Sequence, residues 1–434
     1  MKHKNIILIL ISVLLIFILS SCNYRNNNMQ NDSKETKLFI ATDLHYYSKD
    51  LFDNGNFFNK FIENGDGKLI QYSSDITDAL INEVISANPT AFIISGDLTL
   101  NGEKISHKEL SKKLYKVKRK GIPVLVIPGN HDIYSRNTYR FADEQAYKTA
   151  NISPENFREI YYNLGFSDAL YKDESTLSYI YKVNENLWIL MIDANQNSGY
   201  TSEKGSLSEN TLTWIEECLI KAKEKGATVI SVTHQNLLPH NIIFSKSFTI
   251  KDGSKLVDLL EKYEVKLNLS GHMHVQHIAK SKNENGIYDI ANNSIAVNPN
   301  QYGVINISEN NEINYKTHGI DMATYAANNN INDDNLKDFK KYSEQFFYNT
   351  NYLKIYDSLA DFSLSETERK KMAIFASKVN KSYFSGTEYK TLEQDKNSEE
   401  YKLWRTKADS SFFYDYLYTV LKEEPMDHNT LTIK

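Results

Sequence analysis

Cysteine is almost absent from this chain, which has Cys22 and Cys218 among 434 residues, together with 7 prolines and 3 tryptophans. If Cys22 is consumed by the N-terminal processing discussed below, no internal disulfide is possible in the mature chain. Cys218 falls within a predicted helix, where we expect it to be a small packing residue. The scarcity of thiols also argues against a thiolate site for soft metals.

Concentrated positive charge is also missing. The chain has 50 Lys and Arg against 55 Asp and Glu, a formal net charge of −5, and the basic residues form no block. A protein dedicated to nucleic acid shows a basic face, so we expect no dedicated nucleic-acid binding. The rest of the composition is that of a globular protein, long enough for one large and one smaller domain.

The N-terminus reads as an export signal. After the basic start at Lys2 and Lys4, residues 6–19 are apolar except for Ser12, which is too short for the roughly 20 residues that span a bilayer. The sequence Leu-Ser-Ser-Cys ending at Cys22 resembles the bacterial lipoprotein signal, whose Cys is lipidated; the alternative is a plain signal peptide. We therefore expect a signal peptide over residues 1–21, a lipidated Cys22 that anchors the protein to the outer face of a bacterial cell membrane, and a flexible tether over residues 22–36.

From residue 37 to 317, short apolar runs rich in Ile and Val alternate with helical periodicity, which predicts sheets covered by helices. After about His318 the strand signals stop and helical stripes follow, so residues 318–434 are expected to form a helical domain. The helices expected before it begin at Ser74, which would cap a helix to Ala87, at Lys104, at Pro154 and after Ser208. The predicted strands are Leu38–Thr42, Ala91–Ser95, Pro123–Ile127, Ser178–Val183, Leu187–Ile192, Ala227–Thr233, Lys266–Leu269, Gln276–Lys280, Tyr288–Ala291, Gly303–Ile307 and Ile313–Tyr315.

Polar clusters follow five of these strands. In order they are Asp43-Leu44-His45, Gly96-Asp97, Gly129-Asn130-His131-Asp132, His234 and Gly271-His272-Met273-His274. Ligands of α/β sheets gather beyond the carboxyl ends of strands, so these side chains are expected to meet at one rim. If strand geometry continues, alternation sends Asp43 and His45 the same way, and likewise His272 and His274. The glycines would let the backbone turn sharply as it leaves the sheet.

Imidazole, carboxylate and amide groups in this number suit two divalent metal ions of the Mn, Fe or Zn kind. One carboxylate can bridge the pair. Each cluster alone is a weak signal, because Asp-x-His and Gly-Asp occur by chance and a lone His after a strand is usually structural. His107, His240 and His277 are expected to lie outside the metal set.

The ordered set of clusters resembles the full signature of calcineurin-like metallophosphoesterases. Gly96-Asp97-Leu98-Thr99 with Gly102-Glu103 further resembles the bacterial branch of class III cyclic nucleotide phosphodiesterases, and the lipoprotein signal with a helical C-terminal domain resembles surface phosphodiesterases of Gram-positive bacteria. The resemblance implies a four-layer αββα sandwich over residues 37–317. It also implies one metal held by Asp43, His45, Asp97 and His274, and another held by Asp97, Asn130, His234 and His272.

The mechanism expected from this site is hydrolysis of a phosphodiester by a hydroxide shared between the two metals. His131 is the candidate for contacting phosphate and protonating the leaving group. Asp132 either orients that imidazole or ties down its own loop. Arg136 and Arg140 either touch phosphate or form surface ion pairs, and Tyr46 and Tyr134 either stack on a base or pack.

Three functions stay open. The favoured one is a phosphodiesterase acting outside the membrane on a small phosphoester, with cyclic nucleotides among the candidates. The second uses the same site as a phosphomonoesterase, nucleotidase, or lipid or cell-wall phosphodiesterase. The third is a surface binding protein whose metals are structural. The oligomeric state leaves no signal in the sequence.

Overall fold

The computed structural model describes residues 35–195 and 203–434. The predicted signal peptide, Cys22 and nearly all of the predicted tether lie outside these ranges. Within them, no helix combines the length and the apolar character needed to cross a bilayer.

The first sheet has six strands in the order β15-β14-β13-β1-β2-β3. Its centre is β1, which pairs in parallel with β2 and antiparallel with β13, so that Ile40 lies opposite both Ile93 and Gly303. The strands are β1 (Thr36–Ala41), β2 (Ala91–Ile94), β3 (Val124–Val126), β13 (Gln301–Ile307), β14 (Ile313–Gly319) and β15 (Thr430–Ile433).

The second sheet has seven strands in the order β11-β12-β10-β9-β8-β7-β6. Its strands β8, β9, β10 and β12 run parallel to one another, and antiparallel strands flank them at both sides. The strands are β6 (Tyr171–Lys172), β7 (Tyr179–Asn184), β8 (Leu187–Ile192), β9 (Thr228–Thr233), β10 (Leu267–Ser270), β11 (His277–Lys280) and β12 (Tyr288–Ala291).

Alternation along β8 shows how the two sheets and their helices share the core. Ile189 and Met191 belong to the large cluster that also contains Leu38 and Ile40 of the first sheet. Trp188 and Leu190 face the other way, into a separate cluster with helices α6 and α8. Since successive side chains of a strand point to opposite faces, one strand covers both the inter-sheet layer and the outer helical layer. The predicted αββα architecture is confirmed.

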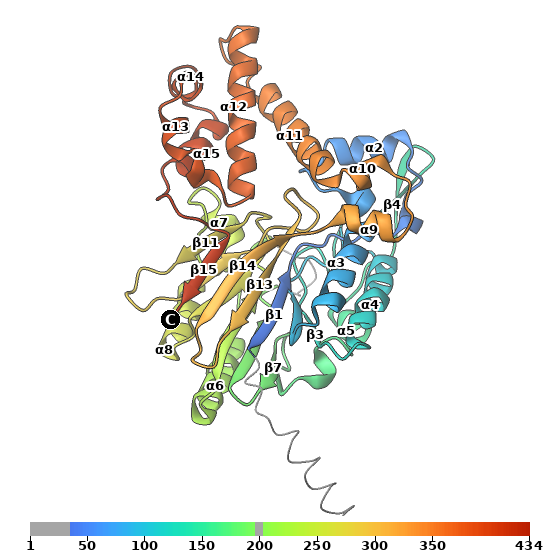
Figure 1. Ribbon diagram of the computed structural model, residues 1–434, viewed down its shortest axis with the longest axis vertical. Helices are drawn as coiled ribbons and strands as arrows, with labels where there is room; N and C mark the ends of the chain where they lie inside the picture. The colour runs from blue at the N-terminus through green and yellow to red at the C-terminus, as the bar shows by residue number, and fades with distance from the viewer. Residues whose placement is uncertain (1–34, 196–202) are drawn as a thin grey trace, which may run out of the picture.

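Helices cover both outer faces, as Figure 1 shows. Ser208 accepts a hydrogen bond from the Thr211 amide at the start of α6, and Gly226 ends that helix in the left-handed region at φ 67°, as the sequence predicts. Ser74, in contrast, caps nothing, because its helix already begins at Ser73. The helices before residue 319 are α2 (Asn56–Glu63), α3 (Ser73–Ala87), α4 (Lys104–Lys118), α5 (Pro154–Ile160), α6 (Glu209–Lys225), α7 (Ser245–Phe248) and α8 (Gly253–Lys262).

The C-terminal region is helical until its last residues, and most of it stands above one end of the sheets (Figure 1). Its helices are α9 (Met322–Asn328), α10 (Asp334–Lys337), α11 (Phe339–Ser358), α12 (Glu366–Phe384), α13 (Leu392–Lys396), α14 (Glu399–Lys407) and α15 (Phe412–Leu421), with a short 3-10 helix η4 (Glu388–Lys390). The expectation that strands end at His318 is wrong, because β15 returns to pair with β14. Four residues with one buried side chain, Ile433, are too few to show a strand period.

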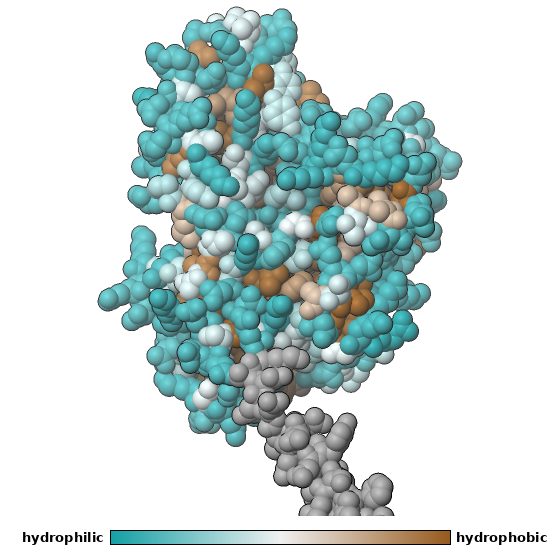
Figure 2. Space-filling model, in the orientation of Figure 1, coloured by the Kyte–Doolittle hydropathy of each residue, from teal (hydrophilic) through white to brown (hydrophobic). Residues whose placement is uncertain are grey.

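On the face that Figure 2 shows, hydrophilic residues dominate and apolar ones form small separate groups. The free thiol of Cys218 is buried in the cluster between α6 and the second sheet. It is the packing residue that the sequence predicts.

Candidate metal centre

Four metal-ligating side chains converge beyond the ends of β1, β2 and β10. Ligand atoms of Asp43, His45, Asp97 and His274 all lie within 4.8 Å of one another. Nε2 of His45 is 3.0 Å from Nε2 of His274, and the latter is 3.3 Å from Oδ1 of Asp43. Two ligand atoms about 2.1 Å from one ion lie roughly 3 Å apart when their bonds to it are near 90°. These spacings suit a single cation.

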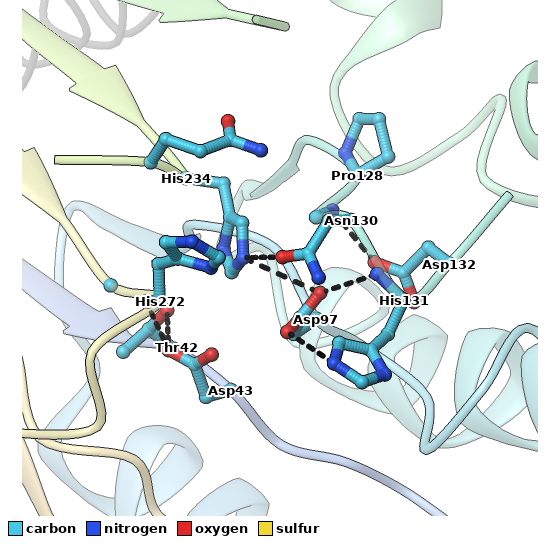
Figure 3. Close-up of polar contacts among 12 residues, drawn as sticks. Thr42, Asp43, Asp97, Pro128, Asn130, His131, Asp132, His234 and His272 are labelled. Carbon is cyan, nitrogen blue, oxygen red and sulfur yellow. Dashed lines mark hydrogen bonds and ion pairs between the residues drawn. The ribbon is translucent and has the colours of Figure 1, made fainter. Parts of the chain in front are cut away.

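A second group shares Asp97 with the first. Its other members by the same criterion are His234 and His272, and Asn130 joins them because its Oδ1 lies 3.0 Å from Nε2 of His234. The same nitrogen is 3.4 Å from Oδ1 of Asp97. Figure 3 shows Asp97 between His234 and His131, with Asn130 beside them. The structure therefore brings together all seven ligands suggested by the sequence, with Asp97 common to both groups.

The backbone presents these ligands in a way the sequence analysis did not expect. Asp43, His45, Asp97, His272 and His274 all have positive φ, between 41° and 70°. Each strand has ended before these residues begin. Their side chains therefore converge because the backbone is left-handed there, and not because side chains alternate along a strand. Non-glycine residues in this region cost of order 1 kcal/mol or more each and concentrate at functional sites.

Two glycines make room for Asp97 and His234. Gly96 has φ 101°, and a Cβ there would lie 2.6 Å from Nδ1 of His234. A Cβ on Gly129 would lie 2.2 Å from Oδ1 of Asp97. Gly129 therefore serves close approach to the ligand, while Gly96 serves both approach and a positive φ.

Several buried polar atoms of the ligand side chains have no hydrogen-bond partner within the described residues, namely Oδ1 of Asp43, Nδ1 of His45 and Nε2 of His272. His234 is more informative. Its Nδ1 lies 2.9 Å from the Ser95 carbonyl, which can only accept, so Nδ1 donates and Nε2 is left to face the oxygens of Asn130 and Asp97. Only a proton or a cation can stabilise that arrangement, so the donor set fits metal ions.

Charge within the site agrees with this fit. Burial holds the pKa of His45 well below its ordinary value, with Lys68 acting in the same direction, and burial lowers that of His272 to about 3. For His234, burial also lowers the pKa, but Asp97, Asp43 and the Ser95 carbonyl together outweigh burial and raise the pKa to about 9. The negative charge that would keep His234 protonated would equally attract a metal ion to its Nε2.

His131 lies beside the metal groups with its side chain 32% exposed. Its amide donates to Oδ1 of Asp97, and its Nδ1 lies 2.9 Å from Oδ1 of Asn101. Because an amide oxygen only accepts, Nδ1 carries the hydrogen of this contact. Nε2 is then the nitrogen available to a substrate, and it lies 3.9 Å from Oδ2 of Asp97.

Asp132 does not orient that ring. Its carboxylate accepts from the backbone amides of Leu98, Thr99 and Gly129, so it ties two ligand-bearing loops together. This is the loop-anchoring alternative considered from the sequence. The residue that positions His131 is Asn101, which the sequence did not single out although it lies within the Gly96–Glu103 motif, directly before Gly102.

A cavity of about 370 Å³ opens on the metal groups. One end is lined by Asp97, Asn130, His131, His272 and His274, together with Lys68. The other end is apolar and comes from α7 with its N-cap residue and from the C-terminal helices. Its aromatic members are Phe244, Phe248, Tyr383, Phe384, Phe412, Phe413 and Tyr416, called the aromatic wall below.

The cation in this cavity is Lys68, which forms a 2.7 Å ion pair with Asp66, and not an arginine. The Arg140 guanidinium lies 4.5 Å from the ring centre of Tyr147, on the hairpin of β4 (Tyr139–Ala142) and β5 (Gln145–Lys148). Tyr46 is buried and donates to Glu109, and Tyr134 packs against the main core. None of these three, nor Arg136, is among the residues that line the cavity.

Two groups of nitrogen and oxygen ligands that share a carboxylate, set beyond the strand ends of a two-sheet sandwich, define the class of dimetal hydrolases. Comparison with known proteins gives the family. Residues 36–276 match the calcineurin-like phosphoesterases, and residues 321–427 match the C-terminal domain of cyclic nucleotide phosphodiesterase. The chain belongs to the calcineurin-like phosphoesterase family, and the protein is a metallophosphoesterase. The prediction of a dimetal cofactor is thereby confirmed.

Individual relatives are more distant. The chain is 27% identical over 197 residues to a probable cyclic nucleotide phosphodiesterase of Ruthia magnifica, a match covering 45% of this chain and 66% of the relative. It is 28% identical over 216 residues to a probable glycerophosphodiester phosphodiesterase GpdQ of Arcobacter nitrofigilis, covering 48% of this chain and 67% of the relative. The matches thus span about two thirds of these relatives' length. A dimetal phosphatase from Danio rerio is structurally similar, with a TM-score of 0.46 at 13% identity, covering 65% of this chain and 96% of that one.

Proposed function

We propose that the protein hydrolyses phosphodiesters that carry an aromatic group, with nucleotides, cyclic nucleotides among them, as the substrate class. One observation carries this proposal: the metal groups and the aromatic wall line the same cavity. A phosphodiester at the metal end would place its ester substituent against rings, and stacking of a base on an aromatic side chain is worth about 1–3 kcal/mol. The name of the Ruthia magnifica relative and the match of residues 321–427 support the same substrate class.

The wall continues from the metal ligands to the C-terminal helices through ring contacts. The ring centre of Phe248 lies 4.8 Å from that of His272, and the ring centre of Phe244 lies 5.4 Å from that of Phe248. The ring centre of Phe244 also lies 6.1 Å from that of Phe412 in α15. These contacts form a continuous apolar surface along which a base can lie while its phosphate stays among the polar groups.

When bound, the two ions would supply Lewis acidity and a water of lowered pKa. The chain's own residues do the positioning. Lys68 offers a positive charge for a phosphate oxygen at the rim of the metal end. His131 presents Nε2 toward the cavity, where it can carry a proton to the departing alkoxide, and Asn101 keeps the ring turned that way.

A substrate panel tests this proposal. The full-length protein loaded with Mn²⁺ is assayed on bis-(p-nitrophenyl) phosphate, p-nitrophenyl phosphate, a cyclic nucleotide and glycerophosphocholine. We expect turnover of the diesters and a lower KM for the nucleotide than for glycerophosphocholine, which has no ring. Preference for the monoester, or equal KM values for the two natural-type diesters, would contradict it.

We also propose that the reaction takes place outside the membrane, with the protein anchored through lipid on Cys22. This rests on the N-terminal sequence alone. Incorporation of a palmitate analogue into the wild type, and its loss together with release from the membrane fraction in a Cys22→Ala variant, is the expected result. Equal labelling of both proteins would contradict it.

A further inference from the structure

A second set of metal-type side chains lies apart from the dimetal ligands, where the C-terminal region meets the second sheet. Ligand atoms of His277, Glu388, Glu423 and His428 all lie within 4.8 Å of one another. They come from β11, from η4, from the residues after α15 and from the turn before β15. Four segments far apart in sequence therefore converge on one point with two imidazoles and two carboxylates.

The proton on His277 can be placed by following its hydrogen bonds. Oδ2 of Asp289 accepts from the backbone amides of Leu237 and Leu238, so it is an acceptor and Nε2 of His240, 3.1 Å away, donates to it. A neutral His240 then has a bare Nδ1, which lies 3.0 Å from Nδ1 of His277 and accepts its hydrogen.

The consequence is that Nε2 of His277 carries a lone pair, and it points at Oε2 of Glu423 from 3.0 Å. Two lone pairs at this distance repel each other unless a proton or a cation lies between them. The hydrogen bonds that link Asp289, His240 and His277 thus fix the tautomer in which Nε2 of His277 can bind a metal ion, as second-sphere carboxylates do at metal sites.

His428 is held in the opposite sense and supports the cluster as a donor. Its Nδ1 accepts from the Ile278 amide at 3.0 Å, so in the neutral ring the hydrogen lies on Nε2, which cannot then bind a cation. That Nε2 lies 3.0 Å from Oε1 of Glu388, and Oε2 of Glu388 is a buried atom with no hydrogen-bond partner among the described residues. Both side chains are buried, with 4% and 5% of their surface exposed.

Charge gives the cluster a reason to bind a cation. Two carboxylates lie together in a mostly buried place, which is costly without compensation. Burial, and then Glu388, raise the pKa of Glu423 to about 8, and burial holds the pKa of His277 well below its usual value. The negative charges of Glu388 and Glu423 would balance one divalent ion, and neutral His277 would be its nitrogen ligand.

We propose that His277, Glu388 and Glu423 form a third cation site, of the zinc type, that fastens the C-terminal region to the second sheet, with His428 holding Glu388 in place. The 3.0 Å between Nε2 of His277 and Oε2 of Glu423 suits ligands about 2.0–2.2 Å from one ion. An open cavity of about 720 Å³, lined by His277, Glu423 and His428 among others, gives an ion access to the cluster.

The position of this site gives it a role. Glu423 follows directly on α15, whose residues Phe412 and Tyr416 line the catalytic cavity. Tyr383, another residue of the aromatic wall, donates to the carbonyl of His240. A cation here would hold the aromatic wall against the sheet that carries the metal ligands, and so act on substrate binding without touching the reaction.

Metal stoichiometry tests the proposal. The full-length protein is stripped with chelator, loaded with Zn²⁺, desalted, and analysed for zinc per chain. We expect three equivalents for the wild type, two for His277→Ala, and one for Asp97→Asn, in which the dimetal site is damaged. His318→Ala, a histidine of β14 outside both clusters, is the matched control and should keep three.

Failure of the third site is distinguishable from failure of the dimetal site. Two equivalents in the wild type, lost together in Asp97→Asn, would overturn this proposal and leave the dimetal site intact. Because His277→Ala removes a buried side chain, Glu423→Gln serves as the conservative variant and should weaken the third equivalent at least about tenfold. Zinc anomalous scattering from wild-type crystals gives a direct reading, with a peak expected between His277 and Glu423, and the lack of one contradicting the proposal.

Discussion

The two ends of the catalytic cavity are built in different ways. The metal end opens on the seven metal-ligand residues, which follow strand ends and are mostly buried, and five of the seven have left-handed backbone conformations; Lys68 lies beside them. The aromatic end consists largely of side chains on helices of the C-terminal region, and some of these are open to solvent, as Phe412 is at 54% exposure. A strained and buried end suits fixed chemistry, whereas exposed rings on helices suit selection among substrates. Changes at the metal end should therefore slow every ester, and changes at the aromatic end should alter the choice between esters.

The largest effect is expected from Asp97→Asn. This change removes the carboxylate common to both metal groups, so turnover should fall on the order of 10³-fold or more for all diesters alike. The measurement is kcat on bis-(p-nitrophenyl) phosphate and on a cyclic nucleotide, with bound metal determined in parallel. Asp258→Asn, on an exposed position of α8, is the control and should behave as wild type. If the variant kept more than a tenth of the wild-type activity, the claim that changes at the metal end slow every ester would be contradicted.

His131→Ala should slow turnover roughly 10²–10⁴-fold with a poor leaving group, the range of general acid catalysis, while the two active-site metals stay bound. Since p-nitrophenolate leaves without a proton, the loss should be much smaller on bis-(p-nitrophenyl) phosphate. Equal losses on both substrates would contradict the proton-donor role and leave His131 as a phosphate contact.

Asn101→Ala should have a smaller effect of the same kind. Asn101 acts through the ring of His131, so we expect about a tenfold loss in kcat with the poor leaving group and little change in KM. The pH dependence of kcat should also shift, because Oδ1 of Asn101 stabilises the hydrogen on Nδ1. Asn101→Asp, which keeps an acceptor, should restore most of the rate; no rescue would indicate a purely structural role.

Phe412→Ala should have the smallest effect and the most selective one. Loss of one stacking ring should raise KM for a cyclic nucleotide about tenfold and leave kcat and the KM for glycerophosphocholine nearly unchanged. Tyr115→Ala, an aromatic 43% exposed on α4, controls for general loss of an exposed ring. If Phe412→Ala lowers kcat on every substrate, the two ends of the cavity are not separable.

Much of the fold was predictable because most of the buried strands carry a local sequence signal. Leu187–Ile192 and Tyr288–Ala291 are found at the predicted residues, since β-branched and apolar runs bounded by turns mark buried strands. The metal ligands were accessible for the same reason: each follows a recognisable strand. Their left-handed conformations were not, because positive φ at Asp43 or His274 depends on tertiary contacts such as the bond from the His272 amide to Asp43.

The remaining parts depend on contacts between distant segments. No local sequence pattern marks Lys68 or Asn101 as a functional residue. Their roles become visible only in the folded chain, which brings them beside His131 and the ligands. In α15, Leu417 and Val420 are buried in the helical core, whereas the exposed ring of Phe412 lines the cavity. His277 and His428 are separated by some 150 positions, and Ile278 bonds to His428 across this gap, so no spacing rule could have paired them.

The most direct test of the central claim is anomalous diffraction from crystals of the Mn²⁺-loaded protein, collected above and below the manganese edge. The account predicts two peaks about 3.5–4 Å apart, both in contact with Asp97, with His45 and His274 at one and His234 and His272 at the other. A single peak, or a pair of which one does not touch Asp97, would contradict it.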